Sequence, residues 1–227
     1  MRQIAFYHIC AVNNWEQIVR EQIGRVEQIH LDEMYFTILG ASWQRASKLL
    51  PSCWKPLFID DKITHYEMPT LDAMQDYCKS RQYGLVLYFH TKGVTRPDSE
   101  WSQRWRRYME WQMFDNWRGC VQEIIGGASI AGCNWREYNK LWHFSGNFFW
   151  ADSRYIVTLP SVYVRRNHPR HIRFNAEFWI GQGRGIAAEM DRFDLNNLIG
   201  ETLELYRTIP QETFYYDIRT GDRTWKP

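Results

Sequence analysis

No run of 18 apolar residues occurs in the sequence, so we expect no transmembrane helix. Neither sign of charge dominates, and the formal net charge of +2 argues against a protein that coats nucleic acid. No CxxC pair is present, which argues against a zinc knuckle; the five cysteines are scattered at positions 10, 53, 78, 120 and 133. We therefore expect buried free thiols and a reducing compartment, the cytoplasm.

Aromatic residues are plentiful, with 12 Trp, 13 Tyr and 12 Phe among 227 residues. Rings at this density suit a site that stacks on a sugar or a base, besides the core itself. The length is enough to bury a core, and no internal repeat or low-complexity linker divides it. We predict a single domain over residues 1–227, either a whole protein or a module of a longer one. The segment 1–12 lacks the layout of a signal peptide and predicts a first strand.

The segment Gly84–Gly93, GLVLYFHTKG, is the most informative part of the sequence for both the fold and the site. Leu85–Phe89 is apolar and uncharged, which predicts a buried central strand of a parallel sheet. The strand breaks into His90, Thr91, Lys92 and Gly93. Because ligands of open α/β sheets bind beyond the carboxyl ends of the strands, these residues are candidates for a site. The alternative is a polar turn that only ends the strand.

The remaining pattern alternates between strands and helices. Apolar segments predict strands at residues 4–11, 34–39, 62–67, 85–89, 129–134 and 141–151. Helical spacing predicts helices at residues 15–28, 43–50, 68–79, 101–125, 153–159, 175–180 and 195–207, with Asn13 or Asn14, Thr70 and Asp152 as N-caps. This alternation indicates a Rossmann-like α/β fold, with a mixed, mostly parallel central sheet flanked by helices. Right-handed crossovers would bring Asn13, Asn14, Gly40–Ser42 and His90–Gly93 to one rim.

Three polar features each allow two interpretations. The arginines in RWRRYMEW could be solvated or could clamp a phosphate. Gly146, between Ser145 and Asn147 inside an apolar segment, could mark a simple bulge or a close approach to a ligand. The basic segment 165–173 could be a solvated loop or could neutralise phosphate. The glycines of GQGRG, at 181–185, match no phosphate-binding loop because no strand precedes them.

The order of these pieces resembles the GT-A glycosyltransferases. More narrowly, YFHTKG, a Trp/Arg-rich helix, HFSGNFFWA and AEFWI resemble small glycosyltransferases of bacteria and of large algal (chlorella) viruses, where they are associated with capsid glycans. The resemblance covers Ile4–Ile180 and implies a GT-A-like domain. For a viral chain it would place the protein in the host cytoplasm.

The resemblance also implies roles for individual residues. The donor nucleotide sugar would contact Ala11, Asn13 and Asn14 near its base and His90, Thr91, Lys92, Gly93 and Arg104 near its phosphates. The sugar and the acceptor would contact Ser145, Gly146, Asn147 and Trp179, and Glu177 would be the catalytic base. The alternative for Glu177 is a carboxylate that stabilises a helix start.

One departure from the GT-A pattern concerns the metal. Most GT-A enzymes hold Mn²⁺ with an Asp-x-Asp where this chain has His90-Thr91-Lys92. Either Lys92 neutralises the diphosphate, with arginines from 104–107 or 165–173, or His90 contributes a ligand to Mn²⁺ or Mg²⁺.

These expectations combine into a transferase that moves a sugar from a nucleotide sugar, expected to be UDP-linked such as UDP-glucose, to a hydroxyl of a glycan or protein-linked glycan. A single placed carboxylate favours direct displacement with inversion. It also argues against a glycosidase, which would need two carboxylates. The alternatives are an inactive sugar- or nucleotide-binding domain and a nucleic-acid binding module. The near-zero net charge argues against nucleic acid as a partner.

Overall fold

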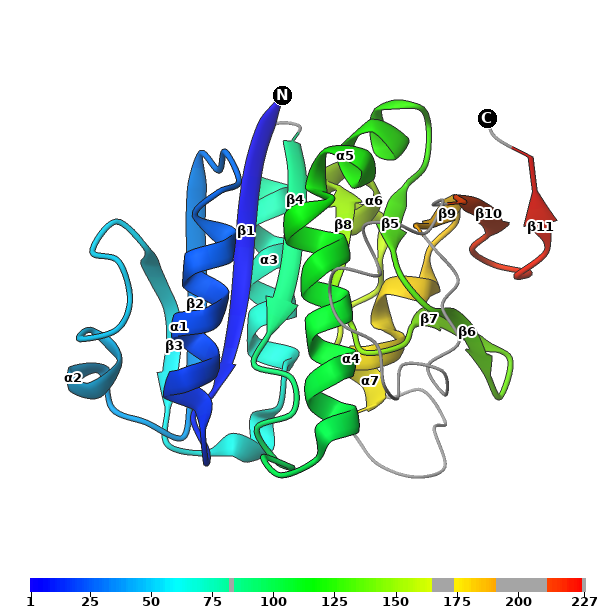
Figure 1. The fold of residues 1–227 in the computed structure, drawn as a ribbon. Coiled ribbons are helices and arrows are strands. Elements are labelled where there is room, and N and C mark those ends of the chain that lie inside the picture. Colours follow the sequence, from blue (N-terminus) through cyan, green and yellow to red (C-terminus); the bar gives the residue numbers. More distant parts are fainter. Residues whose placement is uncertain (82–83, 165–173, 191–211, 226–227) are drawn as a thin grey trace.

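A computed structural model describes residues 1–81, 84–164, 174–190 and 212–225. The chain folds as a Rossmann-like α/β domain around a nine-stranded sheet with the order β11-β10-β9-β5-β8-β4-β1-β2-β3 (Figure 1). The strands β3, β2, β1 and β4 are mutually parallel, whereas β8 is antiparallel to both of its neighbours, β4 and β5. The fold class predicted from the alternation of strands and helices is confirmed.

The strands of the large sheet are β1 (Arg2–Cys10), β2 (Glu33–Leu39), β3 (Lys55–Asp60), β4 (Gly84–His90), β5 (Ile130–Gly132), β8 (Phe149–Asp152), β9 (Ile186–Glu189), β10 (Phe214–Asp217) and β11 (Arg223–Thr224). A separate hairpin pairs β6 (Trp135–Tyr138) with β7 (Leu141–Phe144). The helices are α1 (Trp15–Val26), α2 (Trp43–Ala46), α3 (Met68–Ser80), α4 (Glu100–Glu110), α5 (Trp117–Ile125), α6 (Ser153–Thr158) and α7 (Phe174–Trp179). No helix in these ranges is both long and apolar enough to cross a membrane.

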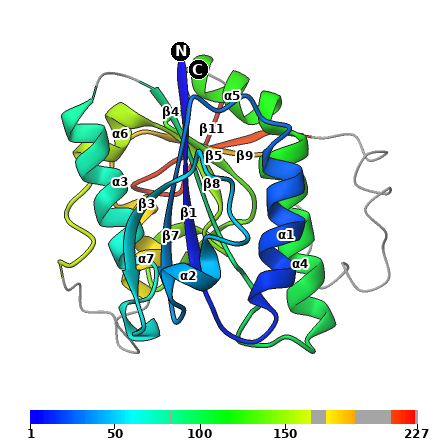
Figure 2. The ribbon, with the colours of Figure 1, turned by 90° about the vertical axis from the view of Figure 1, so that its left-hand side faces the viewer.

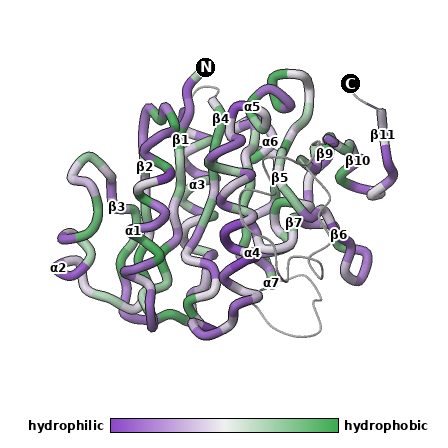
Figure 3. The backbone as a smooth tube through the Cα atoms, viewed as in Figure 1, coloured by the Kyte–Doolittle hydropathy of each residue, from purple (hydrophilic) through white to green (hydrophobic). Residues whose placement is uncertain are grey.

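The core lies on both faces of β1 and β4, and all seven residues of β4 are buried. Because side chains alternate along a strand, Leu85, Leu87 and Phe89 pack with α1, α4 and α5, whereas Val86 and Tyr88 pack with α3, α6 and α7. Figure 2 shows these two helical layers on opposite sides of the sheet. The first residues of β4 are hydrophobic, while α4 is mostly hydrophilic (Figure 3).

The strand predicted at Lys62–Glu67 is wrong. The third strand is β3, Lys55–Asp60, and Ile63–His65 forms a 3₁₀ turn, η1. Pro56 lies inside β3, and β3 is the edge strand of the sheet. An edge strand tolerates proline because one side of it forms no ladder hydrogen bonds.

The single strand predicted at Leu141–Ala151 is also wrong, because Ser145–Phe148 divides it. β7 belongs to the small hairpin and β8 to the large sheet. Gly146 (φ +95°) and Asn147 (φ +59°) both adopt left-handed backbone conformations, so Gly146 marks a turn instead of a bulge.

The helix predicted at Trp101–Ile125 is interrupted, because a π-helical turn, η2 (Trp111–Asp115), and Asn116 separate α4 from α5. Thr70 is not an N-cap: Glu67 holds that position in α3, and Thr70 is buried inside the helix. Asn14 precedes α1 without a side-chain cap, whereas Asp152 caps α6 as predicted. The predicted helix at 195–207 and the basic segment 165–173 lie outside the described residues.

The cysteines form no disulfide, as expected from their spacing. Cys78, Cys120 and Cys133 are buried, but Cys53 is exposed and Cys10 is half-buried, so only part of the prediction of buried thiols holds.

Candidate functional site

The carboxyl ends of β1 and β4 meet at one rim of the sheet, as the topology predicted. The backbone N–H of Cys10 donates to Thr91 Oγ1 at 2.9 Å. Asn13 Nδ2 donates to the carbonyl of Val94 at 2.6 Å. These bonds fix the loop that follows β4 against the loop that follows β1.

A cavity of about 370 Å³ opens at this rim. It is lined by His8 and Cys10 of β1, Ile63, Tyr66 and Glu67 of the segment before α3, His90–Arg96, Trp101, Ser102 and Trp105 of α4, and Glu177 of α7. His90, Thr91, Lys92, Gly93 and Glu177 were all predicted as site residues from the sequence. The remaining lining residues were not.

His90 is buried and holds the turn between β7 and β8. Its Nε2 lies 2.9 Å from the carbonyl oxygen of Gly146; because a carbonyl only accepts, the proton sits on Nε2. Burial, followed by the charge of Lys92, lowers the pKa of His90 to about 3. The imidazole is therefore neutral at physiological pH.

Glu177 reaches the same turn from α7. Its Oε1 accepts from the backbone N–H of Gly146 at 3.3 Å. The peptide groups of Gly146 thus contact both the imidazole from β4 and the carboxylate from α7. Gly146 shapes the site through these contacts, although the described cavity wall includes none of Ser145, Gly146 and Asn147.

Glu67 is a functional candidate that the sequence analysis missed. Its Oε2 accepts from Tyr88 OH at 2.7 Å and from Asn147 Nδ2 at 2.6 Å. Its Oε1 lies 4.0 Å from His90 Nε2. The preceding residue, Tyr66, has φ +51° and ψ −147°, a strained conformation for a non-glycine residue of the kind that clusters at functional sites. In the sequence, Glu67 is only an acidic residue before the helix start Met68-Pro69. Such residues are common at the starts of ordinary helices, so this pattern does not identify a functional residue.

Lys92 lies over an aromatic ring on the opposite wall. Its Nζ is 4.0 Å from the centroid of the Trp105 ring, and Trp101 packs beside Trp105 with ring centroids 4.6 Å apart. An ammonium over an indole face is attracted by the ring quadrupole. The pair therefore places one cation on the α4 side of the cavity.

Several predicted site residues lie elsewhere. Trp179 is fully buried, and its Nε1 donates to the carbonyl of Pro160 at 2.8 Å, so its ring cannot pack on a sugar as predicted. Arg104 pairs with Glu100 and is not part of the described cavity wall. Ala11, Asn13 and Asn14 flank the cavity without lining it, and Asn13 serves to anchor the loop at Val94.

The residues at this rim do not fit the divalent metal that a GT-A resemblance implies. Among the residues that the structure describes, no group of three or more His, Cys, Asp and Glu side chains could hold a metal ion. His90, the predicted ligand, has its Nε2 proton directed at Gly146. Both carboxylates in the cavity already accept hydrogen bonds from the 146–147 turn.

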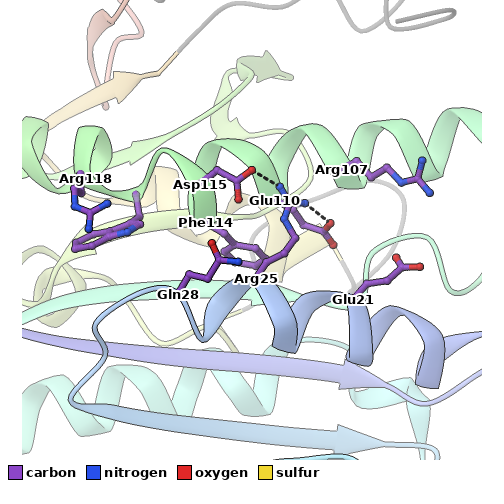
Figure 4. A pocket seen from close by; sticks show the side chains of 9 residues that line it. Glu21, Arg25, Gln28, Arg107, Glu110, Phe114, Asp115 and Arg118 are labelled. Carbon is purple, nitrogen blue, oxygen red and sulfur yellow. Dashed lines mark hydrogen bonds and ion pairs between the residues drawn. The ribbon is translucent and has the colours of Figure 1, made fainter. Parts of the chain in front are cut away.

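A larger cavity, of about 560 Å³, lies between α1 and the α4–α5 segment (Figure 4). Three of its charged side chains, Arg25, Glu110 and Asp115, are paired with one another. Arg25 contacts Glu110 at 3.0 Å and Asp115 at 2.8 Å, the two interactions drawn as dashed lines in Figure 4. Of the residues considered from the sequence, only Arg107, one of the arginines of 104–107, lines it. We therefore take the smaller cavity as the candidate site.

The fold and this rim define an α/β domain with a polar cavity at the carboxyl ends of parallel strands. Residues 6–182 match the model of a family described as a domain of unknown function (DUF8361), and the chain belongs to that family. No curated protein matches the chain.

Two solved structures show weak similarity. One is a homologue of Mycobacterium tuberculosis Rv0371c from Mycobacterium sp. strain JC1, at 12% identity over 67% of this chain and 71% of that chain, with a TM-score of 0.35. The other is Rv0371c of M. tuberculosis H37Rv in complex with manganese, at 10% identity over 70% of this chain and 77% of that chain, with a TM-score of 0.37. Similarity at this level establishes neither a common fold nor a common function.

Proposed function

We propose that the protein is a glycosyltransferase that uses a nucleotide sugar, expected to be UDP-linked, as donor and a glycan hydroxyl as acceptor. The observation that carries the proposal is the joint position of Lys92 and Glu177 in one cavity at the end of β4. The transfer of a sugar needs a cation beside the leaving diphosphate and a base beside the acceptor, and this cavity offers both.

In the proposed reaction Glu177 takes the proton of the acceptor hydroxyl. The acceptor oxygen forms a bond to the anomeric carbon as the bond from that carbon to the phosphate oxygen breaks. The electron pair of the broken bond leaves on the nucleoside diphosphate, whose charge Lys92 stabilises. Attack opposite the leaving group inverts the anomeric centre.

Hydrogen bonds around Gly146 support the role of Glu177 as the base. The N–H of Gly146 orients one carboxylate oxygen, and His90 and Glu67 hold the turn from its other side through Gly146 and Asn147. A base that is held in this way loses little conformational freedom when the acceptor arrives, which is the condition for efficient proton transfer.

Thermal shift and turnover with a panel of UDP-, GDP- and CMP-sugars, with and without Mn²⁺, test the proposal. We expect one UDP-sugar to raise the melting temperature, because a ligand stabilises the state that binds it, and to release UDP in the presence of an acceptor. Glu177→Gln should keep the thermal shift and lose transfer by about a hundredfold or more. The control is Glu137→Gln, which changes an exposed carboxylate of β6.

Full activity in Glu177→Gln would disprove the assignment of the base. Binding of a nucleotide sugar without turnover under any condition would instead identify an inactive binding domain. The absence of Asp-x-Asp at the end of β4 is the observation that favours this second candidate.

A further inference from the structure

We infer that the rim after β4 is an anion site in which Lys92 and Arg96, with no divalent metal, bind the two phosphates of a nucleoside diphosphate. This inference deepens the proposed function and rests on it for the identity of the anion. Arg96 was not among the arginines that the sequence suggested for this role. It lines the cavity together with Lys92, whereas Arg104 does not.

The two cations flank one tight turn. The N–H of Arg96 donates to the carbonyl of Gly93 at 2.9 Å, which closes a four-residue turn directly after Lys92. Gly93 has φ +92°, a conformation that favours glycine. Asn13 fixes the middle of the turn by donating to Val94 at 2.6 Å. The backbone that carries Lys92 and Arg96 is thus anchored to the loop after β1.

Both side chains can contact an anion in the cavity. Lys92 is placed over Trp105, a contact that a phosphate can replace because an ion pair with phosphate is stronger than an exposed cation–π contact. Arg96 is exposed, and no hydrogen bond or ion pair joins its guanidinium to any residue in the described ranges. A guanidinium can bind phosphate through two parallel N–H groups, and an ammonium acts as a point charge beside it.

The two acids of the cavity come from other elements, Glu67 from the start of α3 and Glu177 from α7. Glu67 and Glu177 are hydrogen-bonded to the 146–147 turn, whereas the two cations extend from the segment 92–96. The cavity therefore has a cationic wall and an acidic wall. The diphosphate of a nucleotide sugar bears one negative charge on each of its two phosphates and matches the cationic wall, which leaves the acidic wall to the sugar and the acceptor.

The scarcity of metal ligands at the rim also favours a metal-free anion site. The described side chains form no group of three or more His, Cys, Asp and Glu ligands, and both carboxylates in the cavity already accept hydrogen bonds from the 146–147 turn. Lys92 and Arg96 supply the positive charge that a metal ion gives in other phosphate sites.

Calorimetric titration of the EDTA-treated protein with UDP and with inorganic pyrophosphate tests the inference. We expect both to bind without metal, and Lys92→Ala and Arg96→Ala each to weaken Kd by about tenfold or more, since hydrogen bonds to charged groups contribute about 1.5–3 kcal/mol. Arg96→Lys should recover part of the loss. The control Arg20→Ala removes an exposed arginine of α1 and should leave Kd within about twofold of the original. Circular dichroism melting of each variant checks that it folds.

The outcomes separate this inference from the proposed function. Binding of UDP and pyrophosphate only with Mn²⁺, or unchanged binding in Arg96→Ala, overturns the anion site even if the protein transfers sugar. Metal-free binding that depends on both cations supports the site even if the sugar panel shows no turnover.

Discussion

His90 and Gly146 are 56 residues apart in the chain, yet His90 Nε2 donates to the Gly146 carbonyl at 2.9 Å. The same glycine donates its N–H to Glu177. One turn between two sheets therefore joins the end of the central strand to the acid of α7. The geometry of the candidate site depends on this turn as much as on the side chains that line the cavity.

Gly146→Ala should destabilise the protein and reduce turnover. A Cβ at this position would clash with Met109 Sδ, and φ is +95°. Left-handed strain and overpacking together should lower the free energy of unfolding by about 2–4 kcal/mol. Urea denaturation measures this loss.

The matched control is Gly24→Ala in α1, where a Cβ would meet nothing within 4 Å and alanine should stabilise the helix by up to about 1 kcal/mol. Adding Met109→Ala to Gly146→Ala should relieve the overpacking but not the backbone strain. An unchanged melting temperature in Gly146→Ala would contradict the described turn.

Glu67→Ala should cost more stability than Glu67→Gln. Alanine leaves the buried hydroxyl of Tyr88 without its acceptor and the amide of Asn147 with only the Ala176 carbonyl at 3.4 Å, and the unsatisfied hydroxyl alone costs about 1–3 kcal/mol. Glutamine keeps one acceptor oxygen for them. Urea midpoints of the two variants measure the difference. Equal stability of the two variants would show that Glu67 does not support the turn.

Stability should fall with acid below about pH 6.5. Burial lowers the pKa of His8 to about 4, and burial with Lys92 lowers the pKa of His90 to about 3. At a pH between these values and the ordinary histidine pKa of about 6.5, both histidines are protonated in the unfolded chain and neutral in the folded chain. Each histidine should therefore cost about 1.4 kcal/mol per pH unit in this window, or about 2 kcal/mol by pH 5.

Urea titrations at pH 7 and pH 5 measure this loss. His8→Asn should reduce the pH dependence, because an amide can take the place of the imidazole beside Thr70, which lies 2.9 Å from Nδ1. Replacing the exposed His30 serves as the control. A slope unaffected by His8→Asn would exclude His8 as a source of the acid sensitivity.

Glu110→Ala should be among the most destabilising single changes on α4. The carboxylate is buried between Arg106 at 3.2 Å and Arg25 at 3.0 Å, and it also accepts from Gln22 at 2.8 Å. Removing it takes away one of the two carboxylates that pair with buried Arg106, the other being Glu21 at 2.7 Å, at a cost of about 3 kcal/mol, the lower end for a broken buried pair. Thermal melting compares it with Glu100→Ala, which breaks an exposed ion pair and should cost under about 1 kcal/mol. Similar melting temperatures for both variants would contradict the buried network.

Local pattern by itself determined the parts of this protein that depend on near neighbours. The apolar segment Leu85–Phe89 is the buried central strand, and the polar residues after it reach the cavity. α1, α3, α6 and α7 follow helical spacing within a few residues of the predicted bounds. A helix or strand that is buried on one face has apolar residues at regular spacing, and a strand that is buried on both faces is a continuous apolar run. Both patterns can be recognised in the sequence without coordinates.

Only the tertiary structure decided which distant residues share the site. Glu67 and Arg96 enter the cavity, whereas Trp179 is buried in the core and Arg104 lies outside the described wall. The division of Leu141–Ala151 between two sheets, and the place of β3 at the edge, likewise depend on strand pairing. Pairing and burial are set by contacts between residues far apart in the chain, and such contacts leave no local period in the sequence.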